Sequence, residues 1–344
     1  AGVANNIGLI LSMAYINTYW ITSWSNSQQF GAFGAALMPY VVLQGLSMID
    51  KRNPDIKTIP LALSMAIMIQ THVLSAIFSV LVLIPFAIYG IYLTSHKARF
   101  LLHGILSVVL VLILTGNVWY TMLDLYHNNR LLSPFPQYNI DFAATTFSWG
   151  GDASGTLGII WLVIFIVQIV LSLQRNQLVS YKNKLISYTG MFFLLASSSL
   201  LPWHAIGIHF LWVYSFLQFP FRLASVAVIL LLIGFGLTLS NYQEINKQVN
   251  FKFINTLLLT IVAVLFIFNF QRFSITSQKW ITNELTTSKA NVIYKTTDVK
   301  QIRLAFRDKD LGKPFSVLQK GTSDYLPISK SSKLWDDNNF HPYN

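Results

Sequence analysis

The chain has 344 residues, of which 53% are hydrophobic and only 11% are charged. Soluble domains carry about 25% charged residues. The low charge and the mean hydropathy of +0.52 therefore exclude a soluble globular enzyme and a disordered chain. The net charge of +11 does not indicate nucleic-acid binding, because no basic run alternates with stacking aromatic residues. We expect an integral membrane protein, with the lipid bilayer as a partner and no nucleic-acid partner.

The cysteine count and the start of the chain add two constraints. Without cysteine the chain has no disulfides, thiolate metal sites or cysteine nucleophiles. The sequence opens at Ala1 inside an apolar segment, with neither a basic region nor a small-residue cleavage site before it. We expect that the amino end of the protein is missing.

Apolar runs long enough to cross a bilayer core of about 30 Å predict the membrane spans. The stretch 58–93 is too long for one span, and its polar middle around His72 predicts two short helices that meet at a turn. The other expected spans are, in chain order, 5–22, 30–49, 100–119, 155–173, 186–202, 221–239 and 253–270. Together they predict an all-α polytopic membrane protein of about nine transmembrane helices over residues 1–270.

The cations between the spans predict the orientation, because short cytoplasmic loops collect Lys and Arg. Four alternate loops hold Lys51, Arg52, Lys57, Lys97, Arg99, Arg175, Lys182, Lys184, Lys247 and Lys252. The outer segments expected between those loops are 23–29, 71–74, 121–154 and 203–220, and Arg130 is their only Lys or Arg. We therefore expect the four basic loops inside and the polar region 271–344 outside the membrane.

The C-terminal region 271–344 differs from the rest of the chain because it has no apolar run of spanning length. Its segments ANVIYKTTD, IRLAFRDK and FSVLQKG alternate apolar and polar residues with a period of two, which is typical of strands. The region is expected to form a small extracytoplasmic module that contains β-structure.

The expected outer loop 121–154 is rich in polar residues, beginning with Asp124 and His127. A carboxylate at the end of a span is suited to act as a general base or to bind a metal that bridges phosphate oxygens. A solvated loop explains the same composition. The loop has no Asp-x-Asp pair, so no metal ligand is assigned and a divalent metal stays open as a cofactor.

His72 is the next candidate, because an ionisable group between two apolar half-helices is costly and often functional. At an outer turn it is placed to meet a phosphate or a sugar hydroxyl. A neutral histidine bonded to a backbone carbonyl explains it equally well.

The segment 200–236 carries the densest local pattern. Its aromatic residues are typical of an interfacial helix, and Pro220 opens the next span with Arg222 at the outer end. A guanidinium beside Gln218 is suited to grip a phosphate or diphosphate with two hydrogen bonds, although Arg222 could equally extend to lipid headgroups. His204 and His209 are five residues apart, which is poor spacing for a two-histidine metal site on one helix.

Several of these segments resemble a known family. The similar segments are AYINTYWITSW, FGAFGAALMPYVVLQGLSMI, MIQTHVLSAIF, residues 200–231 and SDYLP at 323–327. They are similar to bacterial membrane proteins labelled 6-pyruvoyl-tetrahydropterin-synthase-related. These proteins are common in Gram-positive bacteria and look like relatives of the lipoteichoic-acid-glycosylating membrane proteins. The resemblance covers residues 7–327, and its most specific parts are Pro202-Trp203 and 217–222.

The resemblance implies a GT-C type glycosyltransferase in the bacterial cell membrane. Such enzymes move a sugar from a polyprenyl phosphate to an acceptor on the outer face, here a cell-envelope polymer. In that reading Arg222, His72 and His204 hold the lipid phosphate and the C-terminal region shapes the acceptor site. The family's acidic catalytic residue usually follows the first span, and the first loop here, SWSNSQQ, has no Asp or Glu. That residue is therefore expected upstream of Ala1.

The alternative is a non-catalytic or transport-type protein, such as a flippase for a lipid-linked intermediate. Transport requires ionisable groups or broken helices near the middle of the bilayer. The expected spans hold almost no charge at their centres, which favours the transferase.

Overall fold

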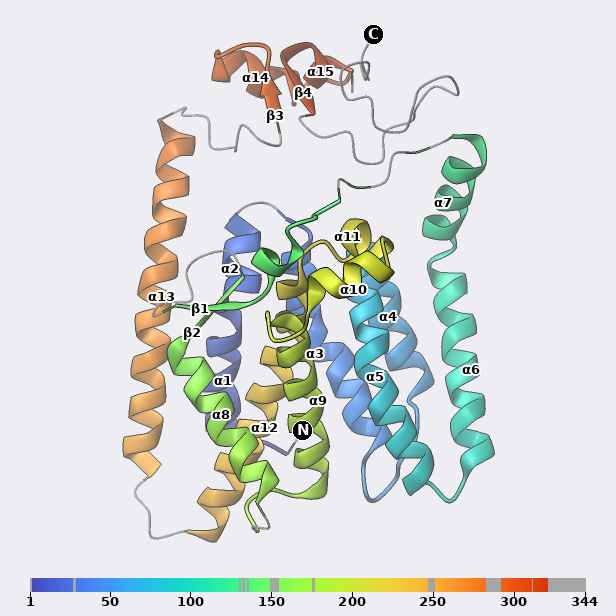
Figure 1. Cartoon of the computed structure of the whole chain (residues 1–344), viewed down its shortest axis with the longest axis vertical. Helices are drawn as coiled ribbons and strands as arrows, with labels where there is room; N and C mark the ends of the chain where they lie inside the picture. The colour runs from blue at the N-terminus through green and yellow to red at the C-terminus, as the bar shows by residue number, and fades with distance from the viewer. Residues whose placement is uncertain are drawn as a thin grey trace. The chain divides into compact units, whose positions relative to one another are not determined.

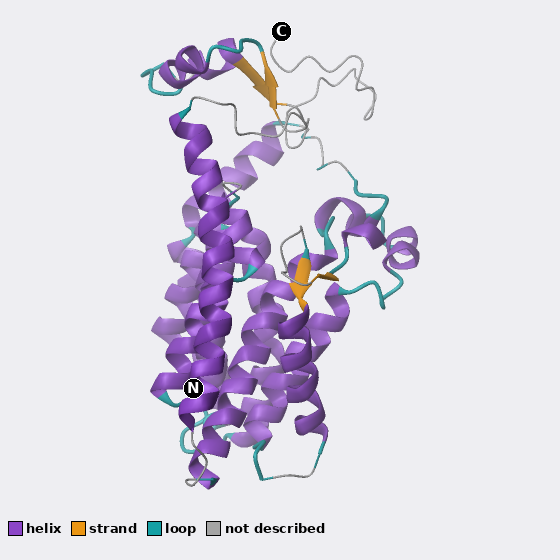
Figure 2. Ribbon diagram, turned by 90° about the vertical axis from the view of Figure 1, so that its left-hand side faces the viewer, coloured by secondary structure: helices purple, strands orange, loops and turns teal. Residues whose placement is uncertain are grey.

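A computed structural model describes residues 2–26, 29–129, 131, 134, 136–148, 155–174, 177–246, 251–282, 292–310 and 312–320. Helices dominate this part of the chain, and the strands are two short pairs (Figure 2). The prediction of a predominantly helical protein with helices suited to a membrane is confirmed.

The helices of the first two hundred residues are α1 (Asn5–Ile16), α2 (Tyr19–Asn26), α3 (Gly31–Met48), α4 (Thr58–Thr71), α5 (Val73–Leu93), α6 (Lys97–Leu114), α7 (Gly116–Asn128), the 3-10 helix η1 (Ile140–Ala143), α8 (Ile159–Leu173) and α9 (Tyr181–Ser197). They are followed by α10 (Trp203–His209), α11 (Trp212–Phe216), the 3-10 helix η2 (Pro220–Leu223), α12 (Ala224–Ile245), α13 (Phe251–Ile281), α14 (Val299–Ala305) and α15 (Lys313–Val317). Strands β1 (Thr146–Ser148) and β2 (Thr156–Gly158) pair in parallel, and β3 (Val292–Tyr294) and β4 (Leu318–Lys320) pair antiparallel.

Five helices of the described residues are long and apolar enough to cross a membrane, namely Gly31–Met48, Val73–Leu93, Lys97–Leu114, Pro220–Ile245 and Lys252–Lys279. Three shorter apolar helices are Asn5–Ile16, Thr58–Thr71 and Ile159–Leu173. The expected hairpin over 58–93 is present as α4 and α5, which meet at His72.

Three expected spans are divided or shortened. The run 5–22 divides into α1 and α2, with Asn17 and Thr18 between them. The run 100–119 divides at Thr115, whose hydroxyl donates to the Val111 carbonyl at 2.7 Å. A separate helix, α7, then extends into the segment expected to be a loop. The run 155–173 gives a helix of only 15 residues, because 156–158 pair as a strand instead.

The chain divides into two compact units. The first comprises Ala1–Trp119, Asn139–Ile206 and Phe219–Asn269, and the second comprises Tyr120–Tyr138, Gly207–Gln218 and Phe270–Asn344. Within the first unit, the connections α3–α4, α5–α6 and α8–α9 lie at the same end (Figure 1). We call this end of the unit the basic end. Its described cations, in the connections and the adjoining helix starts, are Lys51, Arg52, Lys57, Lys97, Arg99, Lys182 and Lys184.

The core of the first unit is built around α12. Its residues 224–232 are all buried, so the helix is apolar on every side, as a central helix should be. It packs against α9, where Gly190 allows a close approach: a Cβ there would lie 2.8 Å from Cγ of Leu231. A small residue at a helix crossing is a common way to bring apolar helices together in a membrane.

A buried polar cluster joins α8, α9 and α12. Gln168 Nε2 donates to the Ser187 hydroxyl at 2.9 Å, and Gln168 Oε1 accepts from the Thr238 hydroxyl at 2.8 Å. The Asn183 side-chain amide also donates to Thr238, at 2.9 Å. All four side chains are nearly inaccessible to solvent. Because each finds partners inside the protein, the cluster ties three helices together without leaving polar atoms in an apolar surrounding.

The C-terminal region folds differently from the expectation. The segment ANVIYKTTD does contain β3, and FSVLQKG begins with the last three residues of α15, which β4 follows. The segment IRLAFRDK was expected to be a strand, which is wrong: α14 covers its first residues. The reason is Asp298, whose side chain accepts from the backbone N–H groups of Lys300 and Gln301 and starts the helix. Ile302 then packs inward as the buried residue of that helix.

Candidate functional site

His72 occupies the turn between α4 and α5 and caps α5. Its ring Nδ1 accepts a hydrogen bond from the backbone N–H of Ser75 at 3.3 Å and lies 2.8 Å from the Ser75 hydroxyl oxygen. A ring nitrogen that accepts carries no proton, so in the neutral ring the proton is on Nε2. The cap thus fixes the ring and leaves Nε2–H as a hydrogen-bond donor.

Helix α3 packs closely against this cap through Gly34. A Cβ at position 34 would overlap the Ser75 hydroxyl, would lie 2.7 Å from Ser75 Cβ and would be 3.4 Å from His72 Nδ1. Gly34 is therefore the residue that lets α3 approach the cap. The sequence analysis missed Gly34 and Ser75, although His72 and Ser75 have the three-residue spacing of a side-chain helix cap.

Arg222 is placed by the 3-10 turn η2 at the start of α12. The turn begins with Pro220, and the backbone N–H of Arg222 donates to the Phe219 carbonyl at 3.0 Å. The guanidinium carbon of Arg222 lies 4.8 Å from the centre of the Phe219 ring, which is a cation–π contact. As expected, this segment opens a helix that is long and apolar enough to cross a membrane, Pro220–Ile245.

Phe221 anchors the same turn to the N-terminal helices. The indole N–H of Trp20 donates to the Phe221 carbonyl at 3.0 Å, and the rings of Trp24 and Phe221 are 6.2 Å apart. On the other side, Gly155 has a φ of 73° and sits so close that a Cβ there would lie 2.8 Å from Phe221 Cγ. Contacts from α2 and from the residue before β2 therefore hold the backbone that carries Arg222.

The electrostatics of the site favour an anion. His72 lies just before the first residue of α5. Burial lowers the pKa of His72 below the ordinary value of 6.5, and the positive charge of Arg222 lowers it further. Arg222 is thus near enough to disfavour a second positive charge on His72. An anion placed between the two groups would relieve that repulsion and would accept hydrogen bonds from both.

The other predicted site residues lie in different surroundings. The backbone N–H of His204, at the start of α10, donates to the Asp141 carboxylate at 3.1 Å. Gln218 has a left-handed φ of 56°, and its backbone N–H donates to the Val213 carbonyl at 3.1 Å. Asp124 on α7 accepts from the Asn128 side-chain amide at 2.7 Å.

Of the five candidates, His72 and Arg222 are linked electrostatically, since Arg222 contributes to the lowered pKa of His72, and both belong to the first unit. Asp124 and Gln218 belong to the second unit. Arg130, which the sequence analysis also noted, lies outside the described residues. No group of three or more His, Asp or Glu side chains suited to a metal is found in the ranges that the structure describes.

Comparison with known proteins gives no relatives: no family model, no curated protein and no solved structure matches the chain.

Proposed function

We propose that this chain is a membrane glycosyltransferase of the GT-C type, which transfers a sugar from a polyprenyl phosphate to a cell-envelope acceptor on the outer face of a bacterial cell membrane. The observation that supports the proposal is that His72, whose ring is fixed by its cap of α5, lies near enough to Arg222 for the charge of that arginine to contribute to the lowered pKa of His72.

The recognition step is binding of the lipid phosphate. The Arg222 guanidinium forms two parallel hydrogen bonds to phosphate oxygens, as this group does with tetrahedral anions. His72 Nε2–H donates to a further oxygen. Held in this way, the phosphate is the leaving group of the transfer, and a positive charge beside it stabilises the negative charge that develops as the bond to the sugar breaks.

The position of the pair along the helices supports an outer site. Helix α5 has 21 residues, so its start at His72 and its end near Lys97 are about 30 Å apart, which is the thickness of a bilayer core. The basic end of the first unit lies at the opposite ends of α4 and α5. If the basic end is cytoplasmic, His72 is extracytoplasmic. The proposal includes about nine spans and an extracytoplasmic region 271–344 that shapes the acceptor site.

A third residue of the first unit, His204, has an expected role in the proposal, which is to contribute to phosphate binding.

The first experiment measures binding of polyprenyl phosphate and of the uncharged polyprenol to the full chain in lipid nanodiscs. Because Arg222 recognises the phosphate, Arg222→Ala is expected to lower affinity for the phosphate roughly tenfold or more and to leave polyprenol binding unchanged. Arg52→Ala is the matched control, since it removes an exposed arginine at the basic end. Equal losses for phosphate and polyprenol, or no loss at all, would remove Arg222 from phosphate recognition.

The second experiment tests catalysis directly. The complete protein is given a polyprenyl-phosphate-linked sugar, and sugar transfer to isolated envelope polymer is followed with a radiolabelled donor. Arg222→Ala is expected to reduce transfer and Arg52→Ala to leave it unchanged. A chain that moves the labelled lipid across the bilayer without transferring the sugar would instead be a transporter.

A further inference from the structure

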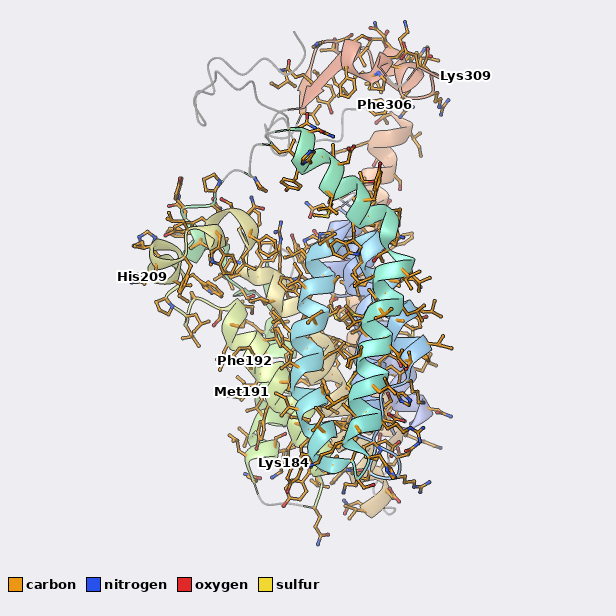
Figure 3. The ribbon with its side chains drawn as sticks, turned by 90° about the vertical axis from the view of Figure 1, so that its right-hand side faces the viewer. Lys184, Met191, Phe192, His209, Phe306 and Lys309 are labelled. Carbon is orange, nitrogen blue, oxygen red and sulfur yellow. The ribbon has the colours of Figure 1, made fainter. Side chains whose placement is uncertain are left out.

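The small module formed by residues 292–320 presents apolar and basic side chains together. Its interior is small, with Ile302 and Val317 as its buried residues. Leu304 is 68% exposed and Phe306 is 60% exposed, and Phe315 and Ile293 are about half exposed. Figure 3 labels Phe306 and Lys309 in this module. Four large exposed apolar side chains in so short a segment point to a surface that covers them.

The charge of the module is strongly positive. Residues 292–320 contain seven cations and three acids. Each acid bonds to nearby backbone N–H groups: Asp298 at the start of α14, and Asp308 and Asp310 in the turn that follows. The exposed cations Lys300, Arg307, Lys309 and Lys313 form no ion pair among the described residues.

We propose that this module docks on an anionic bilayer surface, with Leu304 and Phe306 entering the headgroup region and the four cations contacting lipid phosphates. The mixture of side chains decides the class of partner. A soluble anionic polymer would be bound by the cations alone and would leave the apolar side chains in water. An anionic membrane interface satisfies both kinds of side chain.

The covalent connection makes this docking feasible. Ten peptide steps separate Thr282, just after α13, from Val292, and an extended chain of that length reaches at most about 35 Å. The module is therefore confined near the bilayer that α13 crosses. A weak interfacial attraction is then sufficient for docking, because the effective concentration of the tethered module at the bilayer is high. The inference does not depend on which side of the membrane the module occupies, nor on sugar transfer.

The absence of cysteine from the chain allows a direct test. Phe306→Cys in the full chain is labelled with an environment-sensitive fluorophore, and the protein is placed in nanodiscs of phosphatidylcholine alone or with phosphatidylglycerol. We expect a shift of the emission to shorter wavelength with phosphatidylglycerol, quenching by lipids that carry a nitroxide in the interface, and a loss of the shift in 1 M salt, where the screening length is about 3 Å.

Three variants in the labelled background separate the contributions. Replacing Lys300, Arg307, Lys309 and Lys313 by Gln is expected to abolish the shift, whereas replacing Lys51, Arg52, Lys57 and Lys97 by Gln changes the net charge equally and is expected to keep it. Leu304→Ser keeps every charge and is expected to reduce the nitroxide quenching. Identical emission in both kinds of nanodisc would overturn the proposal. So would a shift produced by soluble polyphosphate in phosphatidylcholine nanodiscs but not by phosphatidylglycerol.

Discussion

Gln168 and Thr238 are hydrogen-bonded at 2.8 Å across α8 and α12, although 70 positions separate them in the chain. The Thr238 hydroxyl also accepts from Asn183 of α9, so one side chain completes a bond network among three helices. The network is neutral, in contrast to the ionisable groups that a transport path through the membrane would need.

Thr238→Val tests this network, because valine keeps the shape of threonine and removes the hydroxyl. The change leaves Gln168 and Asn183 each without one buried partner and should cost about 1–2 kcal/mol of stability. We expect a lower midpoint of thermal unfolding in detergent. Thr260→Val is the matched control, since the Thr260 hydroxyl is exposed and bonds only to the Thr256 carbonyl of its own helix among the contacts described. Equal midpoints for both variants would show that the network contributes nothing measurable.

Gly34→Ala should disturb the cap of α5. The added methyl meets the Ser75 side chain beside His72, so α3 or Ser75 has to move, at a cost of about 1–3 kcal/mol. We expect a reduced unfolding midpoint together with weaker binding of polyprenyl phosphate. Gly116→Ala is the control, because a Cβ at position 116 meets nothing within 4 Å. A stable Gly34→Ala variant with unchanged phosphate binding would contradict the role given to the cap.

Trp20→Phe removes the indole N–H that holds the Phe221 carbonyl and preserves an aromatic ring. The loss of one hydrogen bond should cost about 1 kcal/mol and loosen the turn that carries Arg222. The expected result is a weaker preference for polyprenyl phosphate over polyprenol. Trp119→Phe deletes a comparable bond, from the indole to the Thr115 hydroxyl at 2.7 Å, and should leave that preference intact.

The affinity for a polyprenyl-phosphate-linked sugar should depend on pH through His72. Burial and Arg222 lower the pKa of His72, and a bound anion raises it again, so binding favours the protonated ring. Affinity should therefore increase as the pH falls toward the lowered pKa that His72 has in the protein without ligand. The phosphodiester of this ligand keeps its single charge over that range, so a change in affinity reports on the protein. His72→Asn retains a capping side chain and should flatten the profile.

The lowered pKa of His72 also affects the folding stability of the protein without ligand, which falls at low pH while the affinity for ligand rises. Because the folded state favours the neutral ring, the contribution of His72 to stability is present above pH 6.5 and is lost as the pH falls through its lowered folded-state pKa. Thermal unfolding midpoints measured across this range should fall with acidification in the original chain. His72→Asn should show a smaller change, and an identical change would assign the effect to other groups.

The sequence predicts the helices of the first unit well wherever apolar composition alone decides them, as in α3, α5 and α12. It predicts the break at His72 because a polar residue there interrupts an apolar run. The strand expected at 302–309 is wrong because the helix cap at Asp298, which accepts from two backbone N–H groups, outweighs a period-two pattern of three apolar residues. Short patterns of that kind are weak evidence for strands.

For the candidate site, the sequence identifies the chemically distinctive residues His72 and Arg222, since a histidine and an arginine stand out among apolar neighbours. It does not identify the residues that position them. Gly155 and Phe221 meet only after the chain has folded, and their contact depends on a left-handed backbone at Gly155 that composition does not indicate.

The short helix α8 has a consequence for the surrounding lipid. Its 15 residues extend only about 22 Å, yet it exposes large apolar side chains, including Val163, Ile166 and Val170, along one face. If α8 is one of the proposed spans, a bilayer core of about 30 Å cannot match that length without thinning beside it. Such hydrophobic mismatch should make the protein favour lipids with shorter acyl chains on this flank.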